Sequence, residues 1–223
     1  EDKVVLIHQY VRDNFQWDGT TRKYADNPLR KVMEDKKGSS AELNLLMASM
    51  LEKADIEVYP VLISTRDHGF IREQIPVSSQ FNNTICLAKA GNKQFLLDAT
   101  QKLLPTGFLP ERCLNGKGLA ISKSGHSWVD LTAPVKSRSS ISADLTFNDD
   151  GIFSGRLVID RTGYFAERDR RKYHQKGEKD YVKDWVGSNP WEISKSSIDN
   201  AQELTATLRQ SHELSISEFA TIA

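Results

Sequence analysis

Gly38-Ser39-Ser40-Ala41-Glu42 begins the strongest predicted helix of the chain. Ser39 and Glu42 form the pattern Ser-x-x-Glu, a capping box in which each side chain satisfies a free backbone donor of the first helical turn. We therefore expect Ser40 to be the first helical residue. The helix is predicted to continue to Ala54 and to belong to the core, because apolar residues recur on one face: Leu43, Leu46, Met47, Met50 and Leu51.

The residues around this helix predict a mixed α+β domain. Glu57 to Thr65 is rich in β-branched and apolar residues, which favours a largely buried strand. Asn83 to Ala88 and Lys93 to Asp98 flank the turn-forming stretch Lys89-Ala90-Gly91-Asn92, so we expect an antiparallel hairpin. Further elements are predicted at Lys3 to Asn14 and Pro28 to Glu34, as helices, and within Gly116 to Leu131, as one or two strands.

The pattern changes near Thr132 to Ser140, where proline and serine interrupt it. We therefore predict a core domain over residues 1–133 and a β-rich domain over residues 134–223. The second domain is expected to contain a hairpin around Asn148-Asp149-Asp150-Gly151. Its predicted elements are strands over Ile141 to Phe147, Ile152 to Ile159, Trp191 to Ile198 and Glu203 to Ile216, with a helical insert over Gly163 to Val186 that breaks at Gly177.

Charge and hydropathy exclude several classes of partner. The 223 residues carry 30 basic and 30 acidic side chains, and the formal net charge is +0. No nucleic acid is expected as a partner, because the chain has neither a basic stripe nor an RNA-reading motif. No apolar run approaches the roughly 20 residues that cross a bilayer, so this segment is expected to have no membrane span.

Cysteine and histidine give no sign of a cofactor or a metal. Cys86 and Cys113 are too few for a disulfide framework and lack the spacing of a zinc site. The five histidines are scattered, without acidic or cysteine partners at ligand spacing. We expect no cofactor and no metal, and we expect Cys86, in the apolar run Ile85-Cys86-Leu87, to be a small buried hydrophobe.

Four features stand in a fixed order along the chain: Gly38-Ser39-Ser40 at the start of a long helix, the strand Val58 to Thr65, the stretch Phe81-Asn82-Asn83, and the hairpin end Leu96-Leu97-Asp98-Ala99-Thr100. Taken together, they resemble the transglutaminase-like superfamily over about Val4 to Leu131. The resemblance is to a bacterial branch in which the core is joined to β-rich domains, and it implies a papain-like fold of helices and antiparallel sheet.

The resemblance also assigns positions to a catalytic triad of cysteine, histidine and aspartate. The family cysteine follows a glycine by two positions, and here Ser40 stands there. Asn83 stands where the histidine is expected, and Asp98, fifteen residues later, matches the aspartate. Trp17, 23 residues before Ser40, and Asn82 are expected to line the cleft, although core packing explains Trp17 equally well.

These two replacements predict a degenerate site, acting as a binding or structural module. A serine hydroxyl must lose its proton to a base within hydrogen-bond reach, normally an imidazole, and an amide such as that of Asn83 is no base near neutral pH. Losing the nucleophile or the base of a triad typically costs on the order of 10⁴ to 10⁶ in turnover. We therefore expect a cleft with a polar floor and no activated oxygen.

The alternative is an active hydrolase or acyl transferase that uses Ser40 with another base. His126, in His126-Ser127-Trp128-Val129-Asp130, is one candidate, because many transglutaminase-like enzymes have tryptophan two residues after the catalytic histidine. His68 is the other. This alternative requires a histidine nitrogen about 3 Å from the Ser40 hydroxyl.

The biological context follows only from the resemblance. It implies a peptide or a glycan as ligand, other domains of the same longer chain as partners, and a periplasmic, envelope-associated or secreted location. The chain begins at Glu1, and Leu214 to Ala223 has the pattern of a strand. We therefore expect it to be a piece of a longer polypeptide whose second domain is truncated at the C-terminus.

Overall fold

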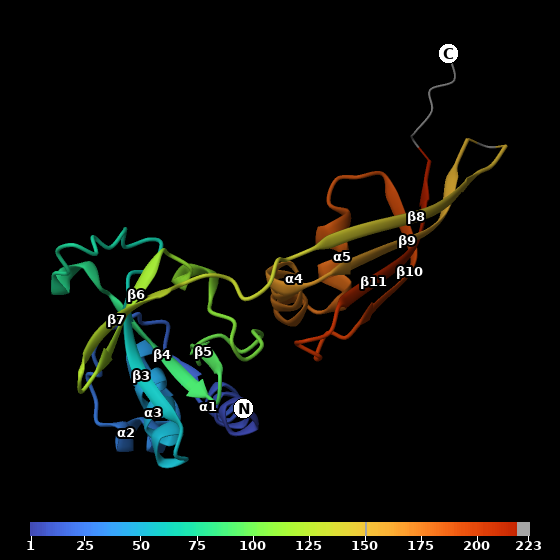
Figure 1. Cartoon of the computed structure of the whole chain (residues 1–223). Coiled ribbons are helices and arrows are strands. Elements are labelled where there is room, and N and C mark those ends of the chain that lie inside the picture. Colours follow the sequence, from blue (N-terminus) through green and yellow to red (C-terminus); the bar gives the residue numbers. More distant parts are fainter. Residues whose placement is uncertain (150, 218–223) are drawn as a thin grey trace. The chain divides into compact units, whose positions relative to one another are not determined.

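The computed structural model describes residues 1–149 and 151–217. The chain divides into two compact units, Glu1–Pro134 and Val135–Ala223. The first unit has three α-helices, α1 (Asp2–Asn14), α2 (Leu29–Asp35) and α3 (Ser40–Lys53). Its antiparallel sheet has the order β5-β4-β3-β6-β7 (Figure 1), with bounds β3 Glu57–Ile63, β4 Asn83–Ala90, β5 Lys93–Leu97, β6 Lys117–Ser122 and β7 Gly125–Asp130.

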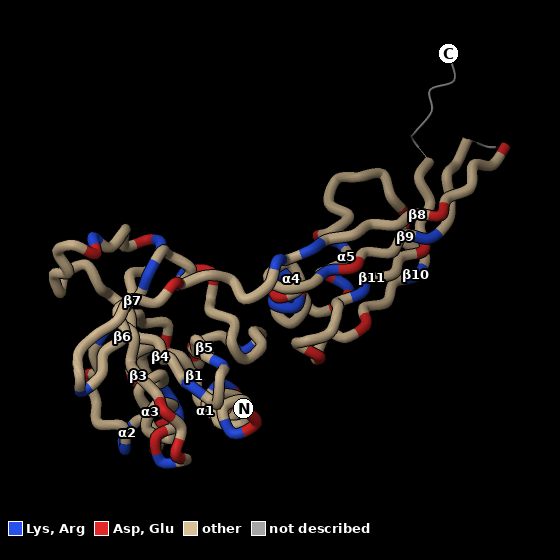
Figure 2. Tube along the Cα trace, in the orientation of Figure 1, with Lys and Arg blue, Asp and Glu red and all other residues tan. Residues whose placement is uncertain are grey.

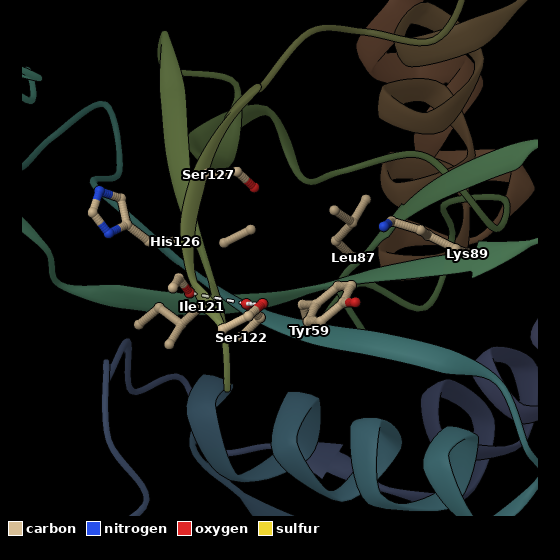
Figure 3. Close-up of a pocket in the computed structure, with 10 residues that line it drawn as sticks. Tyr59, Leu87, Lys89, Ile121, Ser122, His126 and Ser127 are labelled. Carbon is tan, nitrogen blue, oxygen red and sulfur yellow. Dashed lines mark hydrogen bonds between the residues drawn. The ribbon is translucent and has the colours of Figure 1, made fainter.

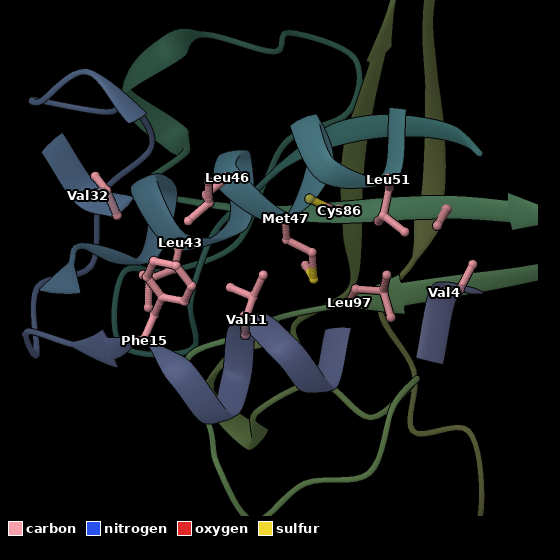
Figure 4. Close-up of a cluster of buried hydrophobic side chains, with 12 residues drawn as sticks. Val4, Val11, Phe15, Val32, Leu43, Leu46, Met47, Leu51, Cys86 and Leu97 are labelled. Carbon is pink, nitrogen blue, oxygen red and sulfur yellow. The ribbon is translucent and has the colours of Figure 1, made fainter. Parts of the chain in front are cut away.

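Helices α1 and α3 form one hydrophobic core with strands β4 and β5 (Figure 4). Met47 and Leu51 of α3 are fully buried with Val11 of α1. Cys86 of β4 and Leu97 of β5 belong to the same cluster. The predicted core position of the long helix is therefore confirmed, and Cys86 is a buried small hydrophobe, as expected.

A second hydrophobic cluster contains residues of β3, β4 and β6. Val61 and Ile63 of β3 lie in it with Ile85 of β4 and Leu109 from the irregular segment before β6. Gly118 of β6 faces the same cluster, and a Cβ atom there would lie 2.7 Å from Val61 Cγ1. The sheet thus has buried side chains on both faces, which holds the ends of β4 and β5 in place.

The second unit contains a four-stranded antiparallel sheet of order β10-β11-β9-β8. Helices α4 (Gly163–Lys176) and α5 (Glu178–Val186) pack on one face of it, where the Trp185 ring of α5 stacks on His212 of β11 at 4.4 Å between centroids. The strands are β8 Ser139–Phe147, β9 Phe153–Arg161, β10 Trp191–Asp199 and β11 Leu208–Ile216.

The α+β class, with a β-rich region after the core, is confirmed. The prediction of a strand from Glu203 was wrong, because β11 begins at Leu208. Asn200 has a φ of 61°, and the Arg170 guanidinium collects the backbone carbonyls of Asn200, Glu203 and Ala206 at 2.7–3.3 Å. Those carbonyls are therefore unavailable for a sheet. Asp150 and residues 218–223, which the predicted turn and terminal strand include, lie outside the described residues.

Acidic and basic residues are interspersed along both units (Figure 2), without a basic stripe in the described part of the chain. None of the helices in that part is long and apolar enough to cross a bilayer.

Candidate functional site

The start of α3 is fixed by a complete capping box. Ser39 is the N-cap, the Glu42 backbone N–H donates to its hydroxyl at 3.4 Å, and the Ser39 N–H donates to Glu42 Oε2 at 2.8 Å. Asn27 donates to Glu42 Oε1 from its backbone and from its side chain, at 2.8 and 2.9 Å. Burial opposes the charge on Glu42, but these donors outweigh it and lower the pKa of the carboxyl. The helix start is therefore fixed by both bonds of the capping box and by Asn27.

Ser40 is the first helical residue and is fully buried. Its hydroxyl accepts a hydrogen bond from the Arg22 backbone N–H at 2.9 Å and donates to the Arg22 carbonyl at 3.3 Å. Its own backbone N–H donates to the Thr20 carbonyl at 3.0 Å. Within the described part of the chain, the hydroxyl is thus occupied by the loop before α2 rather than by a base.

Asn44 lies one helical turn after Ser40 and connects α3 to the ends of two strands. Its amide nitrogen donates to the Thr84 carbonyl at 2.8 Å, and its amide oxygen accepts from the Ala99 N–H at 2.8 Å. Thr84 follows Asn83, the first residue of β4, and Ala99 follows Asp98, just after β5. Asn44 therefore connects α3 to the start of β4, beside Asn83, and to the turn after β5, beside Asp98.

Asn83 and Asp98 are linked through the cysteine Cys113. The Asn83 amide donates to Cys113 Sγ at 3.5 Å, and the Cys113 thiol lies 3.8 Å from Asp98 Oδ2. All three side chains are buried. Burial and the neighbouring Asp98 carboxylate raise the pKa of the Cys113 thiol, so the sulfur is held in its neutral form.

The remaining oxygen of Asp98 is used within its own turn. Asp98 Oδ1 accepts from the Thr100 N–H at 2.8 Å and from the Thr100 hydroxyl. Arg112 Nη2 donates to the Thr100 hydroxyl at 2.7 Å and lies 3.7 Å from Asp98 Oδ2. The buried ring of His8 in α1 contacts the Asp98 carbonyl at 3.1 Å. Asp98 is thus a well-partnered carboxylate in a fixed turn.

A short pair of parallel strands positions Trp17 beside Arg112. Strand β1 (Gln16–Trp17) pairs with β2 (Lys37–Gly38), so that Trp17 lies opposite Gly38. The Arg112 guanidinium lies over the Trp17 ring at 4.5 Å from its centroid. The Arg112 side chain is a quarter exposed and Trp17 is half-buried, so both are partly accessible.

Asn82 directly precedes β4, and its side chain binds Thr65 in the loop after β3. Its amide oxygen accepts from the Thr65 N–H at 2.9 Å, and its amide nitrogen donates to the Thr65 hydroxyl at 2.7 Å. Both polar groups therefore fasten the end of β3 to the start of β4.

The two candidate replacement bases lie elsewhere. The His68 ring contacts the Ser79 carbonyl at 3.0 Å and is exposed. His126 lies on β7 opposite Ile121 and borders a cavity of about 320 Å³ with Tyr59 and Lys89. Figure 3 shows its ring turned away from Tyr59 and Leu87. Neither histidine is a hydrogen-bond partner of Ser40 among the described residues.

Sequence reasoning missed Asn44, Arg112 and Cys113. A signal existed for Asn44, which is a polar residue on the apolar face of a helix and so requires buried partners. Arg112 and Cys113 belong to a short 3-10 turn, Glu111–Cys113, in an irregular segment whose path no periodicity reveals. No group of His, Cys, Asp and Glu suited to a metal ion occurs in residues 1–149 and 151–217.

These features define an α+β domain whose candidate site lies between the N-terminus of a buried helix and the ends of two neighbouring antiparallel strands. The family model of the transglutaminase-like superfamily matches residues 1–134. The chain therefore belongs to the transglutaminase-like superfamily.

A crystal structure from Parabacteroides distasonis ATCC 8503, described as a "putative protease", is 10% identical to this chain with a TM-score of 0.42. The match covers 97% of this chain and 46% of that one, so this chain spans less than half the length of that protein. No curated protein matched the chain.

Proposed function

We propose that residues 1–134 form a catalytically degenerate transglutaminase-like domain that acts as a binding module. In this proposal the domain keeps the framework of the family site and lacks its chemistry. The β-rich unit and further domains of a larger bacterial envelope or secreted protein would be its context, as the family resemblance implies.

One observation carries the proposal: the Ser40 hydroxyl is buried and bonded on both sides to the Arg22 backbone. A nucleophilic oxygen needs a base to receive its proton and an open approach for the electrophile. Arg22 supplies a backbone donor and a backbone acceptor, neither of which takes a proton near neutral pH. The contacts of Ser40 are those of a structural residue.

The replacement at Asn83 supports the same conclusion. An imidazole at this position would stabilise a thiolate and return a proton to the leaving group. The Asn83 amide instead donates to Cys113, whose raised pKa keeps it a neutral thiol. Neither group is suited to general-base catalysis.

The pair of Trp17 and Arg112 is the feature best suited to ligand binding. A guanidinium on an indole presents a flat surface that is apolar on its face and cationic at its edge. Thr100 holds the guanidinium in place at 2.7 Å. Such a surface suits a peptide carrying a carboxylate or the ring of a glycan.

An NMR titration of the ¹⁵N-labelled protein tests the binding. The probes are a pool of soluble short peptides and a chito-oligosaccharide, each followed separately. The Trp17 indole N–H, which donates to the Thr20 carbonyl at 2.9 Å, is the reporter, and Trp128 of β7 is the internal reference. We expect one probe to shift the Trp17 signal while mass spectrometry finds the probe unchanged. Cleavage or transamidation of a probe would refute the proposed loss of catalysis. A Trp17 signal that no probe shifts would refute the proposed binding role.

A further inference from the structure

The irregular segment between β1 and α2, residues 18–27, is bonded to the first turn of α3. The Ser40 N–H donates to the Thr20 carbonyl at 3.0 Å. The Ser40 hydroxyl accepts from the Arg22 N–H at 2.9 Å and donates to the Arg22 carbonyl at 3.3 Å, and Ser40 is fully buried. We call residues 18–27 the strap, because this segment binds both the hydroxyl and the backbone N–H of Ser40.

The contacts that attach the strap to the rest of the domain are polar. The Thr84 hydroxyl of β4 donates to the Lys23 carbonyl at 2.7 Å, and the Lys23 ammonium donates to the Ser78 carbonyl at 2.7 Å. Asn27 donates twice to Glu42 Oε1, at 2.8 and 2.9 Å. No residue of the strap is buried, and none belongs to either hydrophobic cluster. The strap therefore lacks the burial of apolar surface that dominates the stability of a fold.

The flanks of the strap, in contrast, are anchored. Trp17 pairs with Gly38, and Val32 of α2 is buried in the same cluster as α1 and α3. At the start of the strap Gly19 has a φ of 91°, with open space where a Cβ atom would stand, and Pro28 follows its end as the N-cap of α2. Residues at the ends of elements are those that absorb the backbone change when a segment moves between fixed flanks.

Helix α3 has determinants of its own that do not involve the strap. The capping box of Ser39 and Glu42 lies within the first turn of the helix. Met47 and Leu51 are fully buried in the core. Detaching the strap would break hydrogen bonds that water can replace, and it would leave the capping box and the core face in place. Segments attached in this way open locally at free energies well below that of global unfolding.

We propose that the strap opens while the rest of the domain stays folded, and that it thereby controls access to Ser40. Opening breaks the bonds of Ser40 to Thr20 and Arg22, and it exposes the position at which the family resemblance places the nucleophile. It brings no base to the hydroxyl. The inference does not depend on the proposed function, because the strap covers Ser40 whether or not the site binds a ligand.

Alkylation of Ser40→Cys by iodoacetamide, read by peptide mapping, measures the opening. Cys86 and Cys113 of the same molecule are buried and report unfolding of the whole domain. We expect the thiol of Ser40→Cys to react at least about tenfold faster than these two cysteines. It should still react far more slowly than the exposed thiol of Ser124→Cys.

Two strap variants, each added to Ser40→Cys, weaken the attachment of the strap. Thr84→Val keeps the shape of the side chain and removes its bond to the Lys23 carbonyl, so the thiol at position 40 should react about fivefold faster. Lys23→Met removes the bonds to Ser78 at the protein surface and should act in the same direction. Circular dichroism verifies that each variant folds.

A core variant is the matched control for local opening. Val11→Ala weakens the hydrophobic core, which stays intact while the strap is open. It should therefore raise the labelling rates of Cys86 and Cys113 and leave the rate at position 40 unchanged.

Hydrogen exchange of the native chain tests the same opening without a variant. The Arg22 and Ser40 N–H groups bridge the strap and α3, whereas the Leu43 N–H donates to the Ser39 carbonyl within the helix. We expect the Arg22 and Ser40 amides to exchange together and faster than the Leu43 amide.

Three results would each overturn the proposal. The first is a thiol at position 40 that reacts no faster than Cys86 and Cys113. The second is a rate at position 40 that rises with Val11→Ala as much as theirs. The third is protection of the Arg22 and Ser40 amides equal to that of the Leu43 amide.

Discussion

The Asn83 amide nitrogen lies 3.5 Å from the sulfur of Cys113. The thiol in turn lies 3.8 Å from Asp98 Oδ2. Cys113 thus completes a buried polar cluster between the Asn83 and Asp98 positions. The contacts of Cys113 hold Asn83 and Asp98 in a site that we propose to be catalytically inactive.

Cys113 is predicted to be inert in the folded protein. Its burial and the nearby Asp98 carboxylate raise the thiol pKa, and alkylation requires an accessible thiolate. Iodoacetamide, followed by intact mass, should label neither Cys113 nor Cys86 without denaturant and both in guanidinium. Ser124→Cys, in the exposed β6–β7 turn, should label at the rate of a free thiol. Native labelling of Cys113 at that rate would contradict the described burial.

A cysteine introduced at position 40 should react slowly with alkylating agents. Ser40 is fully buried, and its side chain faces the Arg22 backbone. The Ser40→Cys thiol is therefore expected to label with iodoacetamide much more slowly than the thiol of Ser124→Cys. Equal rates for the two variants would mean that the helix start is open to solvent.

Asn44 is predicted to contribute strongly to stability. Asn44→Leu leaves the Thr84 carbonyl and the Ala99 N–H without their partners, at about 1–3 kcal/mol for each buried group. Guanidinium unfolding should show a loss of about 2–5 kcal/mol. Asn14→Ala, which removes one exposed bond to the Tyr10 carbonyl, is the control and should cost less than about 1 kcal/mol. Equal losses would refute the bridging role of Asn44.

Glu42 should give the domain a stability that disappears in acid. Because its folded pKa is lowered, its contribution is present above the unfolded pKa of about 4.3 and is lost as the pH falls through the folded pKa. Glu42→Gln should therefore lower the free energy of unfolding by about 1–3 kcal/mol near neutral pH, and by less at lower pH. Glu34→Gln, which removes only an exposed ion pair with Arg30, should show neither effect. A difference for Glu42→Gln that is independent of pH would contradict the explanation.

The start of α3 could be predicted from sequence because its determinants are local. Ser39 and Glu42 are three residues apart, and a capping box needs no information from elsewhere in the chain. The neighbourhood of Asp98 could not be predicted in the same way. Cys113 and Arg112 reach it from an irregular segment that is held by turns and by the Arg66 contact to the Arg112 carbonyl at 2.9 Å.

In the second unit, too, features set by local sequence could be predicted, and a feature set by a long-range contact could not. The hairpin of β8 and β9 follows from alternation and a turn, both of which are visible in the sequence. The start of β11 does not, because Arg170, more than thirty residues earlier, binds the carbonyls of the preceding loop. Long-range side-chain contacts to the backbone override local strand propensity there.

The reaction of the native chain with a fluorophosphonate, read by intact mass beside Ser40→Ala, tests directly whether Ser40 is an activated nucleophile. Because the Ser40 hydroxyl is bonded to the Arg22 backbone and has no histidine partner among the described residues, we predict no adduct on either protein. A stoichiometric adduct on the native chain that is absent from Ser40→Ala would show an activated serine and contradict the account.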